Sequence, residues 1–435
     1  MADYEPILLR NVGIENSTAL KTYESRGGYR ALRKALKMTP QEVQAEVKAA
    51  NLRGRGGAGF PAGVKWGFLP RDRKITYLCV NGDESEPPTF SNRVLLEQDP
   101  HQLIEGTIIS GYATQTRIAY IYMRVEFHEQ FHVLQRAIDE VYEAGYLGKD
   151  ILRSGYSLEC YIHRGAGAYV CGEETGLLES LEGKRGWPRI KPPFPAVEGL
   201  FHKPTVVNNV ETLCNVPHII ERGAEWFTGI GPEGSSGPKL FCVSGPVQRP
   251  GCFEGPMTIT CRQLIEDDAY ARGMLDGKQV KAVMPGGISM GILTADELDM
   301  KMDFADPANY GLLGLGTAAA VVIDTETDIR DVLANVTRFF SHESCGQCTQ
   351  CREGTGWMYR IARRIADGAG RIEDLDILVE VASNMGMMPG LSICGLSDGV
   401  AYPIRTIVEK FRNEFEEHIR RQSPNRALNV LATMN

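Results

Sequence analysis

Four cysteines constrain this chain more than any other feature of its sequence. Cys345, Cys348 and Cys351 follow a C-x2-C-x2-C spacing, and Cys394 lies further on in the turn-like segment GLSICGLSDG. Thiolates at this pitch can bind three irons of a cubane cluster, and Cys394 can supply the fourth ligand from a turn between two expected helices. The spacing predicts a [4Fe-4S] site at one end of a helical bundle. A zinc site, a three-iron cluster and inert thiols remain alternatives, although structural zinc more often uses two separate C-x2-C pairs.

The other cysteines occur singly in apolar or strand-like stretches, which predicts small buried side chains at Cys79, Cys160, Cys171, Cys214, Cys242, Cys252 and Cys261. The start MADYEPILLR lacks the layout of a signal peptide, and no apolar run approaches the ~20 residues that cross a bilayer. We therefore expect a cytosolic or matrix-like protein that reaches a membrane only through partners. The net charge of -8 argues against nucleic-acid binding.

The spacing of apolar residues changes twice along the 435 residues. Strand-like and helical stretches alternate over residues 1–238, which favours an α/β domain with a parallel sheet. Short strand-like pieces separated by Pro and Gly fill residues 239–327 and indicate a small β-rich domain. From residue 328 to 435 the 3.6-residue period predicts a four-helix bundle.

A glycine-rich segment, NLRGRGGAGFPAGVKW, occupies residues 51–66. Its glycines, Gly54 and Gly56 among them, allow backbone N–H groups to approach an anion, and Lys65 offers a charge for a phosphate. The segment contains neither a G-x-G-x-x-G nor a Walker sequence, and a purely structural turn is the alternative. Phe60 and Phe68 flank it and can either stack on a planar ring or pack in the core.

Polar groups follow several strand-like segments. They lie in VNGDESEP with Asn81, Asp83 and Glu86; in GAYVCGEETG with Tyr169, Gly172, Glu173 and Glu174; in KPPFP with Lys191 and Phe194; and in TVVNNVETL with Asn208 and Asn209. Carboxylates after a strand can accept hydrogen bonds from ribose hydroxyls, whereas solvated loop charge and helix N-terminal charge are the alternatives. Because no hydrolytic triad is visible, cofactor chemistry is the simplest interpretation.

In this order these motifs resemble the NADH-binding flavoprotein subunit of respiratory complex I. The resemblance implies a Rossmann-like FMN domain, a ubiquitin-like β-grasp domain and a C-terminal four-helix bundle that binds [4Fe-4S]. It implies hydride transfer from NADH to FMN and then single-electron steps to the cluster, with no catalytic side chain. It also implies a [2Fe-2S] thioredoxin-like partner, a larger Fe-S subunit and a peripheral position on the cytoplasmic face of a bacterial inner membrane.

Carried over by position, the resemblance implies two sets of binding residues. The FMN set is Gly54, Gly56, Lys65, Asn81, Asp83, Tyr169, Gly172, Glu173, Val207, Asn208, Asn209 and Thr212. The NADH set is Phe60, Phe68, Glu86, Glu174, Lys191 and Phe194, and the charge of Glu174 is expected to disfavour NADPH. A diaphorase subunit of an NAD-linked hydrogenase or formate dehydrogenase, or a non-enzymatic Fe-S sensor or scaffold, are the alternatives.

Overall fold

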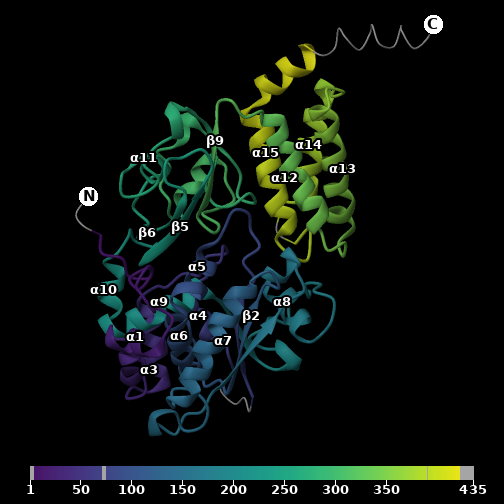
Figure 1. Ribbon diagram of the computed structural model, residues 1–435. Coiled ribbons are helices and arrows are strands. Elements are labelled where there is room, and N and C mark those ends of the chain that lie inside the picture. Colours follow the sequence, from purple (N-terminus) through teal and green to yellow (C-terminus); the bar gives the residue numbers. More distant parts are fainter. Residues whose placement is uncertain (1–3, 71–74, 389, 422–435) are drawn as a thin grey trace, which may run out of the picture.

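The computed structural model describes residues 4–70, 75–388 and 390–421. Its N-terminal part is built on a four-stranded sheet in the order β3-β2-β1-β4, and every neighbouring pair is parallel. The strands are β1 (Tyr77–Gly82), β2 (Ile118–Met123), β3 (Glu159–Arg164) and β4 (Thr205–Asn209). Helices pack around this sheet (Figure 1). The expected Rossmann-like α/β fold is confirmed.

The helices of this part are α1 (Leu20–Ser25), α2 (Arg30–Ala35), α3 (Pro40–Ala49), α4 (Ala62–Trp66), α5 (Ser91–Gln98), α6 (Pro100–Ala113), α7 (His128–Glu143), α8 (Glu174–Leu181), α9 (Val210–Arg222) and α10 (Ala224–Thr228). Thr39 and Glu42 form a capping box at the start of α3. Helix α9 was not predicted from the sequence, because Pro217 lies inside it and proline usually ends or kinks a helix.

The middle part is a mixed five-stranded sheet in the order β6-β5-β9-β7-β8, in which only β5 and β9 pair in parallel. Its elements are β5 (Pro238–Ser244), β6 (Gly251–Pro256), α11 (Cys261–Glu266), β7 (Val280–Met284), β8 (Leu293–Thr294) and β9 (Ala319–Asp324). The order is compatible with a β-grasp domain, which stays a prediction. Of the seven cysteines expected to be buried, six are, and Cys252 is half-buried because β6 is an edge strand.

The C-terminal part is a bundle of α12 (Ile329–Glu343), α13 (Thr349–Ala366), α14 (Ile372–Met385) and α15 (Leu396–Lys410), as expected (Figure 1). Leu333 and Phe340 of α12 lie in its core with Ile404 of α15. Met284 of β7 packs into the same core, so the bundle rests on one face of the middle sheet. Within the described ranges, no helix has the length and apolarity needed to cross a membrane.

Candidate functional site

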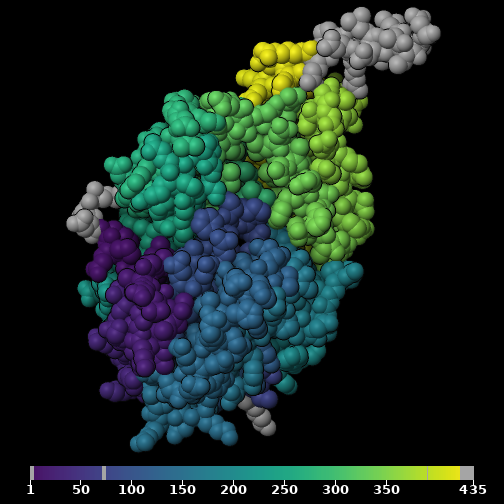
Figure 2. All heavy atoms as spheres, in the orientation of Figure 1, coloured from purple at the N-terminus to yellow at the C-terminus, as the bar shows by residue number. Residues whose placement is uncertain are grey.

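A cavity of about 560 Å³ lies where the three parts of the chain meet. In Figure 2 these parts come together near the centre of the visible face. The α/β part contributes the glycine-rich loop, the segment that follows β1 and the last residue of β4, the middle part contributes Ser289 and Phe304, and the C-terminal part contributes Cys394. Open α/β sheets bind ligands at the carboxyl ends of their strands. We call this cavity the central pocket.

Eight of the predicted nucleotide-binding residues line the central pocket, namely Gly56, Asn81, Asp83, Glu86, Tyr169, Gly172, Glu173 and Asn209. Gly54, Lys65, Val207, Asn208 and Thr212 stand outside its lining. Thr212 Oγ1 accepts a hydrogen bond of 2.8 Å from the backbone N–H of Arg55. Asn208 Oδ1 accepts one of 2.9 Å from Trp66 Nε1.

The carboxylates of the segment after β1 differ in their partners. Glu84 caps the N-terminus of α5 by accepting hydrogen bonds from the backbone N–H groups of Asn92 (2.7 Å) and Arg93 (2.9 Å). Glu86 accepts 2.6 Å and 2.8 Å bonds from the Tyr169 hydroxyl and the backbone N–H of Ser289. Asp83 Oδ2 is buried and has no hydrogen-bond partner within the described part of the chain. Burial raises the pKa of Asp83 to about 7.

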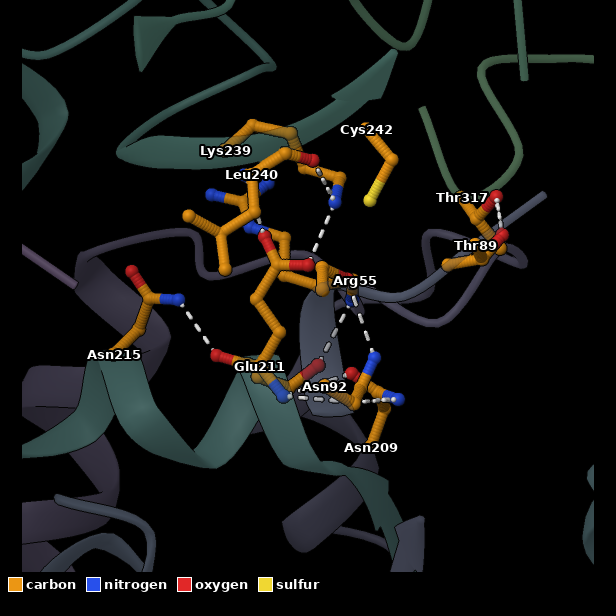
Figure 3. A network of polar contacts seen from close by, with 12 residues as sticks. Arg55, Thr89, Asn92, Asn209, Glu211, Asn215, Lys239, Leu240, Cys242 and Thr317 are labelled. Atoms are coloured by element: carbon orange, nitrogen blue, oxygen red, sulfur yellow. Dashed lines mark hydrogen bonds and ion pairs between the residues drawn. The ribbon is translucent and has the colours of Figure 1, made fainter. Parts of the chain in front are cut away.

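Sequence reasoning missed a network of polar contacts that lies partly in the wall of the central pocket and partly behind it (Figure 3). Lys239 Nζ and Glu211 Oε2 are 2.7 Å apart, and both side chains are fully buried. Asn92 Oδ1 accepts a 2.8 Å bond from Asn209. Arg55 is 2% exposed, and its guanidinium donates to the Ser236 carbonyl. Only the polar composition of TVVNNVETL hinted at Glu211, and no local signal could indicate a partner so distant in sequence.

A second group of charges extends from the wall of the central pocket, and we call it the lysine–glutamate cluster. Lys65 and Glu174 are 3.0 Å apart, and Lys191 lies 2.9 Å from Glu173 and 3.1 Å from Glu174. Burial alone would raise the pKa of Glu174, but Lys65 and Lys191 outweigh it and lower that pKa. Burial opposes the charge of Lys191 likewise, but Glu173 and Glu174 raise its pKa.

The lysine–glutamate cluster connects the segments that carry three exposed aromatic side chains. Phe60 and Phe68 flank α4, which carries Lys65, and their ring centroids are 6.0 Å apart. Phe194 follows Lys191 by three residues. All three are about half exposed, at 45%, 56% and 57%. Such rings could stack on a planar ligand at little cost, because nothing in the core depends on them.

Glu173 and Glu174 have different roles. Glu173 Oε2 accepts hydrogen bonds from the backbone N–H groups of Thr175 (2.7 Å) and Gly176 (3.0 Å), so it caps α8. Glu174 is the first residue of that helix, and its carboxylate pairs with the two lysines instead. The helix N-terminal charge considered as an alternative for this acidic pair therefore fits both residues, Glu173 as the N-cap and Glu174 as an acidic residue of the first turn.

The four cysteines surround a second, smaller cavity at the pocket end of the bundle. Cys345 and Cys348 lie between α12 and α13, Cys351 lies in the first turn of α13, and Cys394 precedes α15. Cys348 Sγ accepts a 3.4 Å hydrogen bond from the backbone N–H of Ile393. Burial raises the pKa of Cys394 to about 12. Cys394 also lines the central pocket, so one residue forms a wall of both cavities.

Both cavities fit the cofactors that the sequence predicts. The volume of the central pocket falls in the range of small-molecule sites, roughly 300–1,000 Å³, and the unpartnered Asp83 Oδ2 offers an acceptor. A Cβ on Gly56 would lie 3.0 Å from the Asn209 side chain, so the loop packs closely there. Four thiols around a cavity are the donor set of a cubane cluster, whose irons each take one ligand. Among the described residues, no group of three or more His, Cys, Asp or Glu could hold a single metal ion.

Comparisons with known proteins identify two separate regions of this chain, one for FMN and one for an iron-sulfur cluster. Residues 47–218 match the model of the Nuo51 FMN-binding domain, and residues 331–418 match that of the NADH-ubiquinone oxidoreductase-F iron-sulfur binding region. The chain is 51% identical to the second F subunit of NADH-quinone oxidoreductase in Rhizobium meliloti (strain 1021), over 96% of this chain and 98% of that protein. It is 48% identical to the NADH-quinone oxidoreductase F subunit of Rhodobacter capsulatus, over 88% of each chain. A chain of an air-oxidized NAD+-reducing [NiFe]-hydrogenase is similar with a TM-score of 0.81 and 35% identity, over 95% of this chain and 67% of that one.

Proposed function

The chain belongs to the family of NADH-quinone oxidoreductase F subunits, and on that premise we propose that the central pocket binds FMN and NADH and that electrons pass from it to an iron-sulfur cluster held by the four cysteines. The protein is an oxidoreductase flavoprotein subunit with FMN-binding and [4Fe-4S]-binding regions. When bound, FMN accepts a hydride from NADH and the cluster carries the electrons onward singly. The observation that carries the proposal is Cys394, which lines both cavities.

The FMN site is proposed from the residues of the central pocket and those directly behind them. Gly56, Asn81, Asp83, Tyr169, Gly172, Glu173 and Asn209 would contact FMN, and Gly54, Val207, Asn208 and Thr212 would hold the loop and strand ends in place. The Asp83 carboxylate would accept a hydrogen bond from the ligand. Lys65 would reach the FMN phosphate by exchanging its bond to Glu174, which is possible because its side chain is 27% exposed.

The NADH site is proposed next to FMN, at the lysine–glutamate cluster. Phe60, Phe68 and Phe194 would stack near the adenine, while Glu86, Glu174 and Lys191 would make polar contacts. The half-exposed rings and the partly hydrated charges support this assignment, since both can change partners when a ligand arrives. No side chain would act as an acid or base.

Electrons would leave the central pocket through the wall that Cys394 forms. Two further contacts connect that wall to the bundle: Tyr169 donates a 3.1 Å backbone hydrogen bond to Glu343, and Trp187 Nε1 donates one of 3.0 Å to the Cys345 carbonyl. These contacts hold the segment that carries Glu343 and Cys345 against the α/β part. Cys345, Cys348, Cys351 and Cys394 would be the four ligands.

The test is to add NADH to the purified protein and follow flavin absorbance, with C348S as the informative variant. We expect bleaching in the wild type. C348S should lose or reshape the cluster, keep FMN and retain part of its NADH to ferricyanide activity, because Cys348 lines only the cysteine cavity. A folded C348S protein that loses flavin and iron together would contradict the separation of the two sites. A scaffold would show no flavin absorbance and no response.

The relatives are subunits of multi-subunit complexes, so this chain functions with partner subunits. We propose a [2Fe-2S] thioredoxin-like subunit and a larger Fe-S subunit as those partners, on the cytoplasmic face of a bacterial inner membrane. We also propose domain limits of 1–238, 239–327 and 328–435, with a β-grasp fold for the second domain.

The second candidate function is that of a diaphorase subunit, which the likeness to a hydrogenase chain favours. Co-purification of this chain with its partners from native cells distinguishes the two candidates. Recovery of membrane subunits would support the respiratory complex, and recovery of a nickel hydrogenase would support the diaphorase.

A further inference from the structure

Two free cysteines face each other across the first hairpin of the middle sheet. Cys242 of β5 and Cys252 of β6 are directly opposite in an antiparallel pair. The backbone N–H of Cys242 donates a 3.3 Å hydrogen bond to the Ala318 carbonyl, on the β9 side of β5. In an antiparallel pair the N–H and C=O of one residue point to the same side, so Cys242 turns neither group toward β6. Cys242 and Cys252 therefore occupy a non-hydrogen-bonded position.

This position suits a disulfide. Opposite residues at non-hydrogen-bonded positions have Cα atoms about 4.5 Å apart, and disulfides span Cα separations of roughly 4.4–6.8 Å. Opposite side chains also leave the sheet on the same face. Here that face packs on the α/β part, because Leu240 and Cys252 contact its core while Phe241 and Val243 face the core of the middle part.

The two thiols differ in their surroundings. Cys242 Sγ is buried and accepts a 3.4 Å hydrogen bond from the backbone N–H of Phe90, the residue before α5. The neighbouring Cys242 thiol and burial raise the pKa of Cys252 well above its usual range, because the Cys252 S–H donates toward Cys242. Figure 3 shows the Cys242 sulfur on the side of β5 that faces the buried network. Cys252 is the half-buried member of the pair.

We propose that Cys242 and Cys252 form a modification site, at which a hydroperoxide oxidises the two thiols to one reversible disulfide. With hydrogen peroxide, one thiol attacks the O–O bond, becomes a sulfenic acid and releases water. The second thiol then displaces that hydroxyl as a second water and forms the S–S bond. The two sulfurs lose two electrons in total, and the peroxide gains them.

The disulfide also acts on the central pocket, a consequence that rests on the proposed function. Bonding to Cys252 draws the Cys242 sulfur away from the Phe90 N–H, which begins the turn into α5. That helix carries Asn92, which bonds both Glu84 (2.8 Å) and Asn209 (2.8 Å) in the wall of the pocket. Oxidation should therefore loosen the support of the FMN site.

The first experiment maps the disulfide in the full-length holoprotein. Protein is treated with hydrogen peroxide, free thiols are blocked by alkylation under denaturing conditions, and peptides are identified by mass spectrometry. We expect a peptide linking Cys242 to Cys252 that disappears with dithiothreitol and is absent from C252S. Cys261, buried in the same part of the chain, is the internal control and should remain alkylatable. Free thiols at both positions after a peroxide dose that bleaches the cluster overturn the proposal, and so does sulfinic acid at Cys252 without a linked peptide.

The second experiment measures the consequence by FMN release during dialysis. After oxidation the wild type should release FMN about threefold faster than oxidised C252S, which suffers the same damage to its cluster. Dithiothreitol should restore the wild-type rate. Equal release rates with a fully formed disulfide overturn the coupling to the pocket. If unoxidised protein binds no FMN, the proposed function fails instead, and the mapped disulfide stands by itself.

Discussion

The two groups of charges around the central pocket have similar distances and very different surroundings. The Glu211–Lys239 pair has 2.7 Å between its charged atoms, and both side chains are 0% exposed. The ion pairs of the lysine–glutamate cluster measure 2.9–3.1 Å, with side chains 20–27% exposed. A buried ion that loses its partner cannot recover water, whereas a half-exposed one can. The first group is therefore fixed, and the second can exchange partners with a ligand.

The partners of the buried pair show what it fixes. Glu211 lies in the first turn of α9 and also accepts a 2.9 Å hydrogen bond from the backbone N–H of Leu240. Lys239 donates a second bond, of 2.9 Å, to the Leu240 carbonyl. The pair thus joins α9 to β5, the first strand of the middle part. In the lysine–glutamate cluster, by contrast, only Glu173 bonds a helix backbone, through its cap of α8.

The largest effect that tests this comparison should come from Lys239→Met. Removing the ammonium leaves the Glu211 carboxylate buried without its counter-ion, so we expect the free energy of unfolding to fall by about 3–5 kcal/mol. Denaturant titration measures it. The matched control is the double variant Lys239→Met with Glu211→Leu, which removes both charges and should recover part of the loss. A fall below about 1 kcal/mol in the single variant would mean that water reaches this pair.

Lys191→Met tests the other side of the comparison with the same substitution. Because exposed or half-exposed pairs contribute only about 0–1 kcal/mol, the free energy of unfolding should change by no more than that. NADH binding should weaken by about 1.5–3 kcal/mol, the usual value of a hydrogen bond to a charged group. Steady-state kinetics would show this as a raised KM for NADH. An unchanged KM together with a large loss of stability would reverse the roles of the two groups.

A smaller effect is expected from Glu174→Gln, which keeps the shape of the side chain and removes its charge. The 2′-phosphate of NADPH beside a fixed carboxylate adds repulsion, and about 1.4 kcal/mol corresponds to tenfold. The kcat/KM for NADPH should therefore rise roughly tenfold, while that for NADH changes less. The two lysines beside Glu174 already neutralise part of its charge and limit the gain. If the ratio of the two values stays constant, Glu174 does not contact the nucleotide.

The sequence named the members of the lysine–glutamate cluster as nucleotide contacts, which stays a prediction, but it indicated neither the ion pairs between them nor the buried Glu211–Lys239 pair. Lys65, Glu174 and Lys191 lie in motifs whose glycines and prolines mark loops, and the ends of parallel strands bring such loops together. Lys239 gave no comparable signal, because a buried cation shows in a sequence only through a partner, and its partner Glu211 is distant along the chain. The sequence named the four cysteines that surround the second cavity, three of them from their local spacing and Cys394 from its turn between two expected helices. The position of Cys394 on the wall of the central pocket depends on how the bundle docks, which no local pattern encodes.

The smallest effect concerns pH and Asp83, a carboxylate of the central pocket that belongs to neither group. Burial raises its pKa to about 7, and the nearby Glu126 and Glu343 add to the rise while Ser85 and Arg124 oppose it. A folded pKa above the ordinary value means that the ligand-free protein binds a proton that the unfolded chain releases, so its stability should fall as pH rises toward 7. A ligand that donates to Oδ2 would favour the carboxylate and expel that proton on binding. FMN affinity should therefore rise with pH up to about 7 and then level off, by at most about tenfold for each unit by which binding lowers the pKa.

The control is Asp83→Asn, which cannot titrate at this position. The difference between wild type and this variant in FMN titrations at pH 5.5 and 8 separates the effect of the Asp83 carboxylate from that of the FMN phosphate. If wild type and Asp83→Asn show the same pH dependence, Asp83 keeps its proton state when FMN binds and accepts no hydrogen bond from the cofactor.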